Sequence, residues 1–480
     1  MKAFDNKLYI DKEVAKIKER LQYFDKLYLE VGGKLFDDNH AARCVPGFLK
    51  DNKIKILKSM KKDLEIIICV SAKSIDAKKE REDYGITYDE EAIRMIKYFK
   101  ENNFKIAGVC ITLYNNEDTV KRFERRIKDL GLKTYIHTFT KGYPSDIDMI
   151  LSSEGYGKNS FIETSKKIIL VTAPGASSGK LATSLSQIYH EYKRVLKAGY
   201  AKLETFPVYN LPLDHPLNIA YEAATIDIGD KNMIDNFHLK AYGISTVNYN
   251  RDIEVFPIIK SILDRITSKD LYKSPTDMGI NYLKDAITNM DIVEKASKEE
   301  IARRYLETKV AFKENKLLTD KSEAIKLMMY NLNMDENIIP GREKILELSK
   351  KRNVDMAIIT LNKKQITGKE SPLLSASSAL FLNTLKYLAK IPDDIMLLPE
   401  NILKAIQLYK KDESIKINEL MMILVSQEMT NPSIKKAIGL IPKLKNKKMH
   451  VTYIIDQAEK AFIKGLGITL SMEAQFKKQN

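Results

Sequence analysis

The sequence lacks the long apolar runs that a membrane-spanning protein needs. No run approaches the roughly 18 apolar residues that cross a bilayer, and the longest, such as residues 64–70, have the length of a single strand. The chain also begins without an apolar signal region, with the residues Met-Lys-Ala-Phe-Asp-Asn. These absences predict a soluble, cytoplasmic protein with no membrane partner.

Cysteine is scarce as well. Cys44, Cys69 and Cys110 are the three cysteines of the chain, and the last two lie in apolar, strand-like segments. Their wide spacing excludes both a disulfide framework and a paired Cys-x-x-Cys metal site. We expect buried, reduced thiols, and the alternative of a nucleophilic Cys44 has no supporting motif.

The chain has an excess of basic residues without a nucleic-acid-binding motif. It contains 79 Lys and Arg against 64 Asp and Glu, a formal net charge of +15, and such an excess can indicate nucleic-acid binding. The basic residues are mixed with acidic ones, however, and the densest run, residues 443–448, has no aromatic residues. Zinc-finger, RNP and KH signatures are missing. We therefore predict a solvated, lysine-rich surface and no nucleic-acid partner.

A chain of 480 residues is too long for one compact core, which predicts several domains. Strand and helix patterns alternate through the first part. Strands are expected at residues 27–31, 64–70, 105–113, 133–139 and 167–172, and helices at residues 54–62, 89–102 and 117–130. This alternation predicts an α/β domain with a doubly wound, mostly parallel sheet. Ligands of such sheets bind at the carboxyl ends of the strands.

The rest of the chain changes character twice. A stretch rich in Pro, Asn, Asp, His and Tyr gives way to a charged helical stretch, which is followed by a Pro340-Gly341 break and a second α/β pattern. The expected segments are an N-terminal α/β domain (1–201), an irregular segment packed on it (202–279), a helical segment (280–336) and a smaller C-terminal α/β domain (337–480) with a strand at 355–361 and a helix at 375–389.

The most specific chemical motif is a glycine-rich loop between an expected strand and an expected helix. Its sequence is Ala173-Pro174-Gly175-Ala176-Ser177-Ser178-Gly179-Lys180. In a P-loop, backbone N–H groups surround phosphate oxygens, the helix N-terminus adds a positive dipole, and the lysine adds a mobile charge. We therefore predict a phosphate-binding site formed by Gly175, Ser177, Ser178, Gly179 and Lys180.

Two departures separate this loop from an ordinary Walker A motif. Three residues rather than four lie between Gly175 and Gly179, and Leu181 stands where a Ser or Thr would hold magnesium. These departures favour an anion-binding helix start over a nucleotide-hydrolysing P-loop. A tight strand-to-helix turn without a ligand is the alternative.

A second glycine pair follows the first expected strand. Gly32, Gly33 and Lys34 are followed by Arg43. Glycine allows close backbone approach, and arginine suits planar oxyanions. We predict that these four residues form another wall of the same phosphate-binding cleft, with a turn that carries a surface lysine as the alternative.

Candidate catalytic groups lie in the histidine-containing stretch that follows. His190, His215 and His238 are half of the histidines of the chain, and Arg251 comes shortly after. Because histidine serves in acid/base catalysis and metal binding, these four are the predicted catalytic residues, with at least two imidazoles in one cleft with Lys180. No His-x-x-x-His or His-Glu-x-x-His spacing is present, and scattered structural histidines are the alternative.

The sequence does not identify a metal site. Asp146, Asp148 and Glu154 could supply oxygen ligands to a cation, although each is also an ordinary turn residue. The cofactor stays open, with a divalent metal such as Mg²⁺ as one candidate.

Several long runs of the sequence are specific enough to compare with a known family. They include Gly-Gly-Lys-Leu-Phe-Asp-Asp, Lys-Gly-Tyr-Pro-Ser-Asp-Ile-Asp, Ser-Glu-Gly-Tyr-Gly-Lys-Asn and Ala-Pro-Gly-x-x-Ser-Gly-Lys, and the likeness extends to residues 367–374 and 376–379. These runs resemble an uncharacterised bacterial family, described as a numbered domain of unknown function. The resemblance implies an α/β N-terminal part, a helical piece and an α/β C-terminal part, but no established reaction. The C-terminal part is similar to the layered topology of cytidine deaminases, but their zinc site is absent because no cysteine follows Cys110.

These features favour an enzyme that acts on a phosphorylated metabolite or nucleotide, by phosphoryl transfer or by hydrolysis. A non-catalytic binding or scaffold protein for a phosphorylated ligand is the main alternative, and a nucleic-acid-binding protein is a weaker one. The oligomeric state stays open, and the sequence is compatible with a homo-oligomer.

Overall fold

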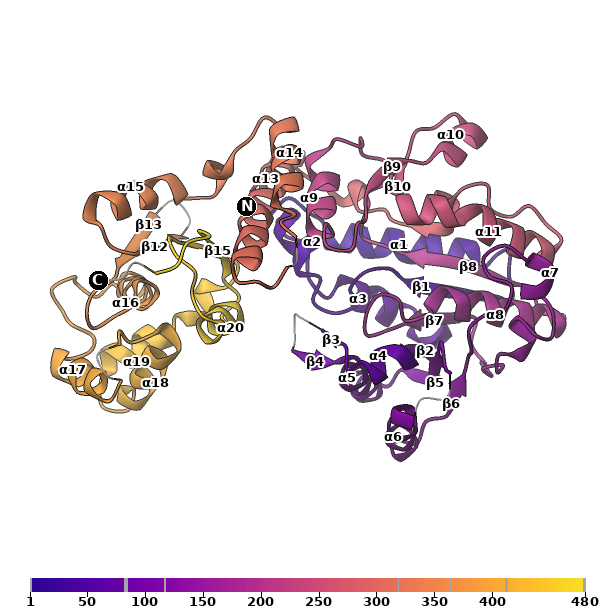
Figure 1. Ribbon diagram of the computed structural model, residues 1–480, viewed down its shortest axis with the longest axis horizontal. Coiled ribbons are helices and arrows are strands. Elements are labelled where there is room, and N and C mark those ends of the chain that lie inside the picture. Colours follow the sequence, from indigo (N-terminus) through magenta and orange to yellow (C-terminus); the bar gives the residue numbers. More distant parts are fainter. Residues whose placement is uncertain are drawn as a thin grey trace. The chain divides into compact units, whose positions relative to one another are not determined.

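The computed structural model of the chain describes residues 2–81, 85–115, 118–317, 319–361, 364–410 and 413–477. The chain folds into two compact units, Met1–Ser297 and Lys298–Asn480, and each combines helices with a sheet of its own (Figure 1). The first unit contains every residue that the sequence singles out for a phosphate or catalytic site.

The main sheet of the first unit has seven strands in the order β11-β8-β1-β7-β2-β5-β6, and every pairing in it is parallel. In chain order its strands are β1 (Lys26–Val31), β2 (Leu64–Ser71), β5 (Lys105–Thr112), β6 (Thr134–Ile136), β7 (Ile168–Thr172), β8 (Ala198–Leu203) and β11 (Gly279–Ile280). Strands β2 and β7 are buried at every position, as expected for Ile-rich and Val-rich strands covered on both faces. The predicted doubly wound parallel sheet is confirmed.

The strand order brings three loops together at one edge of the sheet. β7 lies between β1 and β2, and β8 lies on the other side of β1. Near the carboxyl ends of these strands, Glu30 of β1 is in register with Val171 of β7 and with Lys202 of β8. The loops that follow β1, β7 and β8 therefore leave the sheet side by side.

Helices connect these strands. They are α1 (Asn6–Arg20), α2 (Asn39–Cys44), α3 (Asn52–Ser59), α4 (Ala72–Asp76), α5 (Tyr88–Glu101), α6 (Asp118–Asp129), α7 (Ile147–Ile150) and α8 (Lys180–Lys193), and a short hairpin of β3 (Glu80–Arg81) and β4 (Ile86–Thr87) precedes α5. The helix predicted at 117–130 is α6, and its expected first residue lies outside the described residues. Cys44, Cys69 and Cys110 are buried and form no disulfide within the described residues.

The segment expected to be irregular is more regular than its composition indicates. It contains α9 (Pro216–Ala224), β9 (Asn232–Ile234), α10 (Asn236–Tyr242), β10 (Val247–Tyr249), α11 (Asn250–Thr267) and α12 (Pro275–Met278). Helix α11 is 18 residues long despite Pro257 in its interior. Its apolar face, which includes Phe256 and Ile262, packs into the same core as Ile188 of α8. Burial of that face compensates for the amide hydrogen bond that Pro257 cannot make.

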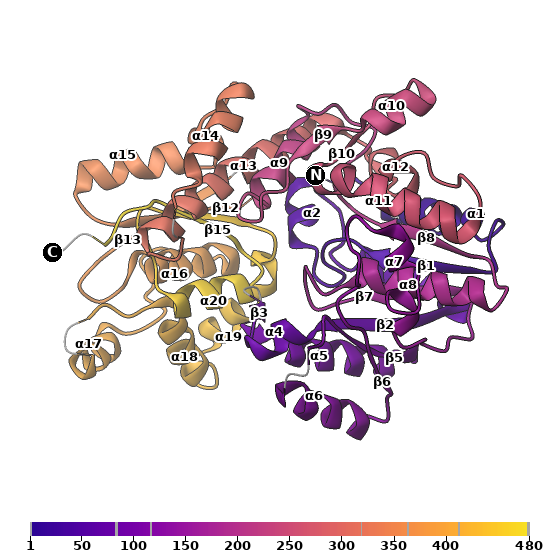
Figure 2. The ribbon, with the colours of Figure 1, turned by 45° about the vertical axis from the view of Figure 1, so that its right-hand side comes forward.

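The second unit is built around a smaller, mixed sheet of four strands in the order β13-β12-β14-β15. β12 is antiparallel to both of its neighbours, whereas β14 and β15 are parallel. The strands are β12 (Met356–Leu361), β13 (Lys364–Lys369), β14 (Lys448–Val451) and β15 (Thr469–Met472), and the helices are α13 (Met290–Lys313, shared by both units), α14 (Ser322–Asn331), α15 (Arg342–Arg352), α16 (Ala376–Ala389), α17 (Glu400–Tyr409), α18 (Ile417–Gln427), α19 (Pro432–Ile438) and α20 (Gln457–Gly465). Helix α16 packs on β12 and β13 (Figure 2). The predicted helical middle and second α/β unit are confirmed.

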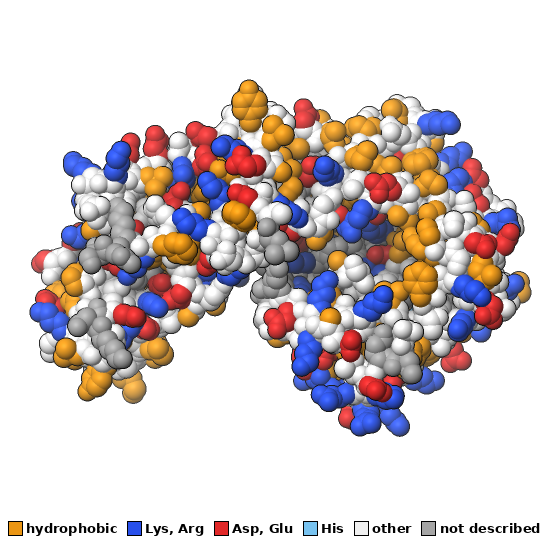
Figure 3. Space-filling view, viewed as in Figure 1, with side chains coloured by type: hydrophobic (Ala, Val, Ile, Leu, Met, Phe, Trp, Pro, Cys, Tyr) orange, Lys and Arg blue, Asp and Glu red, His pale blue; other side chains and the backbone are white. Residues whose placement is uncertain are grey.

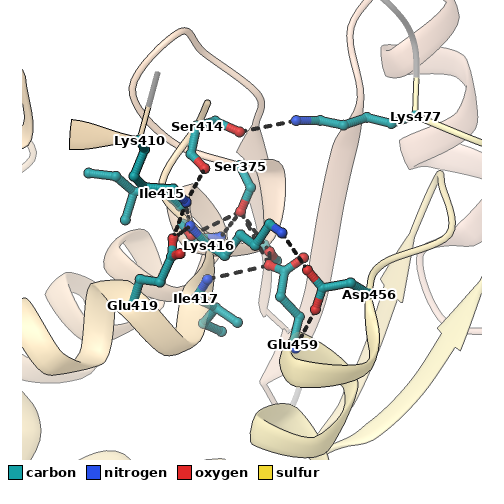
Figure 4. A network of polar contacts seen from close by, with 12 residues as sticks. Ser375, Lys410, Ser414, Ile415, Lys416, Ile417, Glu419, Asp456, Glu459 and Lys477 are labelled. Carbon is teal, nitrogen blue, oxygen red and sulfur yellow. Dashed lines mark hydrogen bonds and ion pairs between the residues drawn. The ribbon is translucent and has the colours of Figure 1, made fainter. Parts of the chain in front are cut away.

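A buried carboxylate joins three helices of the second unit. Glu459 of α20 accepts hydrogen bonds from the Ser377 hydroxyl (2.5 Å) and the Ile417 amide (3.3 Å), which lie in the first turns of α16 and α18 (Figure 4). Ser375 also donates to this carboxylate. Since the donors are all protein groups and the carboxylate is buried, this network has a structural role.

Charged side chains of both signs alternate over most of the face shown in Figure 3, with a denser group of basic side chains over α6. Of the helices within the described residues, none is both long and apolar enough to cross a membrane.

Candidate functional site

The glycine-rich loop connects the end of β7 to the start of α8. Ser177 and Gly179 adopt left-handed conformations, with φ of 58° and 78°. Between them, the Ser178 carbonyl accepts a hydrogen bond from the Thr112 hydroxyl (2.9 Å), and the Ser178 hydroxyl donates to the Gly175 carbonyl (2.9 Å). These contacts hold the loop from its inner side.

The amides that open α8 precede the first hydrogen bond within the helix. The first intrahelical bond of α8 runs from the Thr183 amide to the Gly179 carbonyl (2.9 Å). Within the described residues, the amides of Gly179, Lys180 and Leu181 donate no hydrogen bond to a protein acceptor, and no side chain caps the helix. Because α8 is 14 residues long, its N-terminus also carries a partial positive charge. Amides and dipole together suit an anion.

The glycine at the helix start is required by both conformation and space. A Cβ atom on Gly179 would lie 2.8 Å from the Thr112 side chain, in addition to the left-handed φ. The backbone of the loop therefore packs directly on the end of β5, at the carboxyl edge of the sheet.

Lys180 extends from this loop toward β1. Its Nζ atom lies 3.7 Å from Oε1 of Glu30, and the lysine side chain is 15% exposed. The other oxygen of Glu30 accepts a hydrogen bond from the Tyr200 hydroxyl (2.9 Å). The structure thus brings the lysine of the loop to the end of β1.

The backbone carbonyls of the turn at Gly32-Gly33 bind a buried lysine side chain. The buried ammonium of Lys53 donates to the carbonyls of Gly32 (2.7 Å) and Lys34 (3.1 Å). The Gly32 amide donates to the Leu203 carbonyl (2.9 Å), so it is not available to an anion. Gly33 and the Lys34 residue are exposed, and Arg43 is half-buried on α2.

A second charged group lies where β8 ends. The ammonium of Lys202 lies 2.5 Å from both Glu204 and Asp252, and Tyr209 donates to Glu204 (2.6 Å). Burial raises the pKa of Glu204. Burial alone would lower the pKa of Lys202, but the carboxylates of Asp252 and Glu204 outweigh it, and the pKa lies above its ordinary value.

A small cavity separates this group from the first turn of α8. Its volume is about 80 Å³, and its lining combines charged and apolar side chains from β1, α8, β8, α11 and α12. Leu181, which follows Lys180, is part of that lining. The cavity therefore adjoins the first turn of α8 at the carboxyl edge of the sheet.

The three candidate histidines have separate surroundings. His190, in the last turn of α8, donates to the Asn159 carbonyl (2.8 Å). His215 caps α9 by accepting from the Leu217 amide (3.1 Å), and His238 lies 2.9 Å from the Ser274 hydroxyl. Burial lowers the pKa of both His190 and His215.

Arg251, in the first turn of α11, pairs with Asp230 (2.6 Å). These contacts place the four predicted catalytic residues in different local networks, and a shared catalytic role stays a prediction.

The predicted oxygen ligands are used as ordinary loop residues. Asp146 caps α7, Asp148 pairs with Arg265, and Glu154 is exposed. Within the described parts of the chain, no group of three or more His, Cys, Asp and Glu side chains could hold a metal ion.

Sequence reasoning missed the most enclosed charges of the site. Glu30, Lys202 and Glu204 come at or just after the end of an apolar strand, which is a signal for a ligand edge. Lys53 gives no such signal, because it lies among other lysines in a helix.

Comparison with known proteins agrees with this two-part chain. Residues 2–333 match the model described as domain of unknown function DUF1846, N-terminal, and residues 335–480 match the corresponding C-terminal model. A UPF0371 protein of Clostridium botulinum (strain Eklund 17B / Type B) is 43% identical over 489 residues, covering 98% of this chain and 97% of the relative. A UPF0371 protein of Fusobacterium nucleatum is 43% identical over 498 residues, covering 99% and 98%. The chain therefore belongs to the family of the domain of unknown function DUF1846.

Proposed function

We propose that this protein is an enzyme that binds a phosphorylated metabolite or nucleotide, with the phosphate at the start of α8. The observation that carries the proposal is the set of amides at Gly179, Lys180 and Leu181, which have no protein acceptor within the described residues. A phosphate there accepts hydrogen bonds from these amides and an ion pair from Lys180.

The departures from a Walker A motif fit this arrangement. Leu181 supplies no hydroxyl for magnesium, and its side chain lines the neighbouring cavity instead. The proposal accordingly rests on backbone amides and one lysine, and it needs no metal at this position.

The nearest acid/base groups are those of the cavity. Glu204 and Lys202 form an ion pair (2.5 Å) that lines the cavity, and phosphoryl transfer and hydrolysis both need a base. His190 lies ten residues along α8 from Lys180, roughly 15 Å at the rise of an α-helix. We therefore assign proton transfer to Glu204 rather than to His190.

Thermal shift and calorimetric titration with inorganic phosphate, pyrophosphate and ADP test the anion site. A ligand of the native state raises the melting temperature, and we expect this rise in the wild type. Lys180→Gln removes the charge and should abolish the rise. Lys193→Gln removes a lysine from the other end of α8, and in this variant the ligands should still raise the melting temperature.

Turnover separates an enzyme from a binding protein. An enzyme is supported if the wild type releases phosphate from a bound ligand and Glu204→Gln does not. Tight binding without turnover supports the binding or scaffold alternative. The anion site itself is wrong if no phosphate compound raises the melting temperature, or if Lys180→Gln and Lys193→Gln behave alike.

A further inference from the structure

Helix α18 of the second unit is apolar on its solvent side as well as on its core side. Residues 420–425 form an unbroken apolar run, Leu-Met-Met-Ile-Leu-Val. Leu420 and Leu424 lie in the core of the second unit, whereas Met422 is 66% exposed and Val425 is exposed as well. A helix at a protein surface ordinarily carries polar residues on its outer face. In α18, methionine and valine stand at such outer positions.

Met422, Val425 and Met429 form one apolar ridge, called the α18 ridge below. Residues three and four apart on a helix lie on the same face. The turn after α18 keeps this spacing, because the Asn431 amide donates to the Gln427 carbonyl (3.0 Å), and Met429 is 97% exposed. Apolar side chains gather at the lower left of Figure 3, over the region of α17, α18 and α19 in Figure 1. A ridge of this kind packs into the groove of a neighbouring helix, and flexible methionine side chains adapt to a partner.

The segment that follows the α18 ridge is basic. Residues 428–446 contain one acidic residue, Glu428, and four lysines, which are Lys435, Lys436, Lys443 and Lys445. Lys435 and Lys436 are exposed on α19, which contacts α18. Among the ion pairs of the described residues, none involves either of these two lysines. The ridge and the lysines beside it are therefore complementary to a surface with an apolar stripe and flanking acidic groups.

Other occupants of this surface fit less well. A symmetric dimer brings a patch into contact with its own copy, so the lysines of α19 in both copies would repel each other. A helix that lies on a membrane is ordinarily anchored by Trp, Phe or Leu side chains, whereas the α18 ridge has methionine and valine. Methionine is enriched in the interfaces between proteins. The composition of the ridge and its charge thus favour an acidic protein partner.

We propose that the α18 ridge, together with Lys435 and Lys436, binds an acidic amphipathic helix of another protein. The apolar stripe of that helix packs on Met422, Val425 and Met429, and its carboxylates pair with the two lysines of α19, as in the docking of other amphipathic helices. This surface is independent of the anion site, because all of its residues lie in the second unit.

Matched helical peptides test the proposal. Each is about 20 residues long, enough for an isolated helix, and carries leucine along one stripe and alanine elsewhere. The two peptides differ only in the residues that flank the stripe, which are glutamate in one and lysine in the other. In fluorescence-anisotropy titrations of the full chain, we expect the acidic peptide to bind at least about tenfold more tightly than the basic one.

Variants separate the apolar contribution from the charged one. Met422→Gln combined with Met429→Gln should weaken binding of the acidic peptide about tenfold. Lys435→Gln combined with Lys436→Gln should remove the preference for the acidic peptide. Leu327→Gln changes a side chain of α14 that is 61% exposed, and this control should bind both peptides as the wild type does. Because all of these side chains are exposed, the melting temperatures of the variants should match that of the wild type.

Oxidation of methionine to its sulfoxide by dilute hydrogen peroxide locates the bound peptide, since a covered side chain reacts more slowly. Mass spectrometry should show slower oxidation of Met422 and Met429 when the acidic peptide is present. Met233 of β9, an exposed methionine of the first unit, should react at the same rate with and without the peptide.

Several results would overturn the proposal. Equal affinity for the two peptides, or no binding of either, would exclude an acidic helix as the partner. If the full chain instead binds vesicles of anionic phospholipid and Met422→Gln abolishes that binding, the α18 ridge is a membrane contact. If sedimentation shows self-association that Met422→Gln abolishes, the ridge is covered by a second copy of the chain.

Discussion

Glu13 shows how one buried group ties the stability of the first unit to pH. It lies in α1, is fully buried, and one of its oxygens accepts from the Tyr282 amide (2.8 Å) while the other has no partner. Burial raises the pKa of Glu13 from 4.5 to about 8. Between these values the folded protein holds a proton that the unfolded chain has released.

The stability that Glu13 contributes is therefore complete at low pH and is lost as the pH rises through about 8. Glu13→Gln keeps the neutral form at every pH. From pH 6 to pH 8, urea unfolding should show the wild type losing roughly 1.4 kcal/mol per pH unit relative to this variant. A difference that stays constant over that range would show that Glu13 is ionised in the folded protein.

Single residues were the hardest part of the site to predict from the sequence. The strand and helix on either side of Gly179 and Lys180 could be predicted from a local pattern, and the binding of phosphate by these residues stays a prediction. The burial of Lys53 and Lys202 could not be predicted, since a buried lysine looks like a surface lysine in sequence. Only tertiary contacts, such as the two carbonyls at Lys53, set its environment.

The proposed function rests on the loop between β7 and α8. Gly179→Ala adds a Cβ 2.8 Å from the Thr112 side chain at a φ of +78°. Gly131→Ala meets a similar φ of +71° but has open space around the new atom, which makes it a matched control.

Both substitutions should therefore lower the free energy of unfolding by about 1–2 kcal/mol, because each places an alanine in the left-handed backbone conformation. Gly179→Ala should lower the free energy of unfolding by about 1–3 kcal/mol more, because the new Cβ crowds Thr112. Pyrophosphate should also no longer stabilise this variant. Chemical unfolding with and without pyrophosphate measures both effects. Equal losses in the two variants would contradict the close packing of the loop on β5.

In the second unit, the buried carboxylate of Glu459 joins the starts of α16 and α18. Glu459→Ala leaves the Ser377 hydroxyl and the Ile417 amide without their acceptor, and it should cost about 3 kcal/mol in the free energy of unfolding. Glu400→Ala removes an exposed partner of Lys404 and should change that free energy by less than about 0.5 kcal/mol. Similar small losses in both variants would mean that Glu459 does not hold these helices.

Helices and strands are predicted well from the sequence where a single hydrophobic pattern dominates the segment. Strands β2 and β7 were predicted within a residue or two because their Ile and Val runs are unbroken. Helix α11 was missed because Pro257 and several polar residues hide its apolar face, which only packing against α8 reveals. Tertiary burial overrides local preference there.

For the whole molecule, two divisions of the chain differ in where they place α13. The family models divide the chain between residues 333 and 335, whereas the compact units divide at Ser297. Val310 of α13 lies in the core of the second unit, and Glu299 and Glu314 pair with Lys448 and Lys460. We infer that α13 is needed for the second unit to be stable.

Two fragments test this inference. Residues 290–480 retain α13, and residues 335–480 lack it. The longer fragment should melt at least about 5 °C higher, since about 1 kcal/mol shifts the melting temperature of a small domain by that amount. Equal melting temperatures would show that the second unit is complete without α13.

The central claim is that the start of α8 binds a phosphate, and a crystal structure of the full chain grown with inorganic phosphate tests it most directly. The account predicts a phosphate whose oxygens lie about 2.7–3.2 Å from the amides of Gly179, Lys180 and Leu181, with the Lys180 ammonium turned toward it. A structure in which those amides instead donate to protein carbonyls, with no anion bound, would contradict the account.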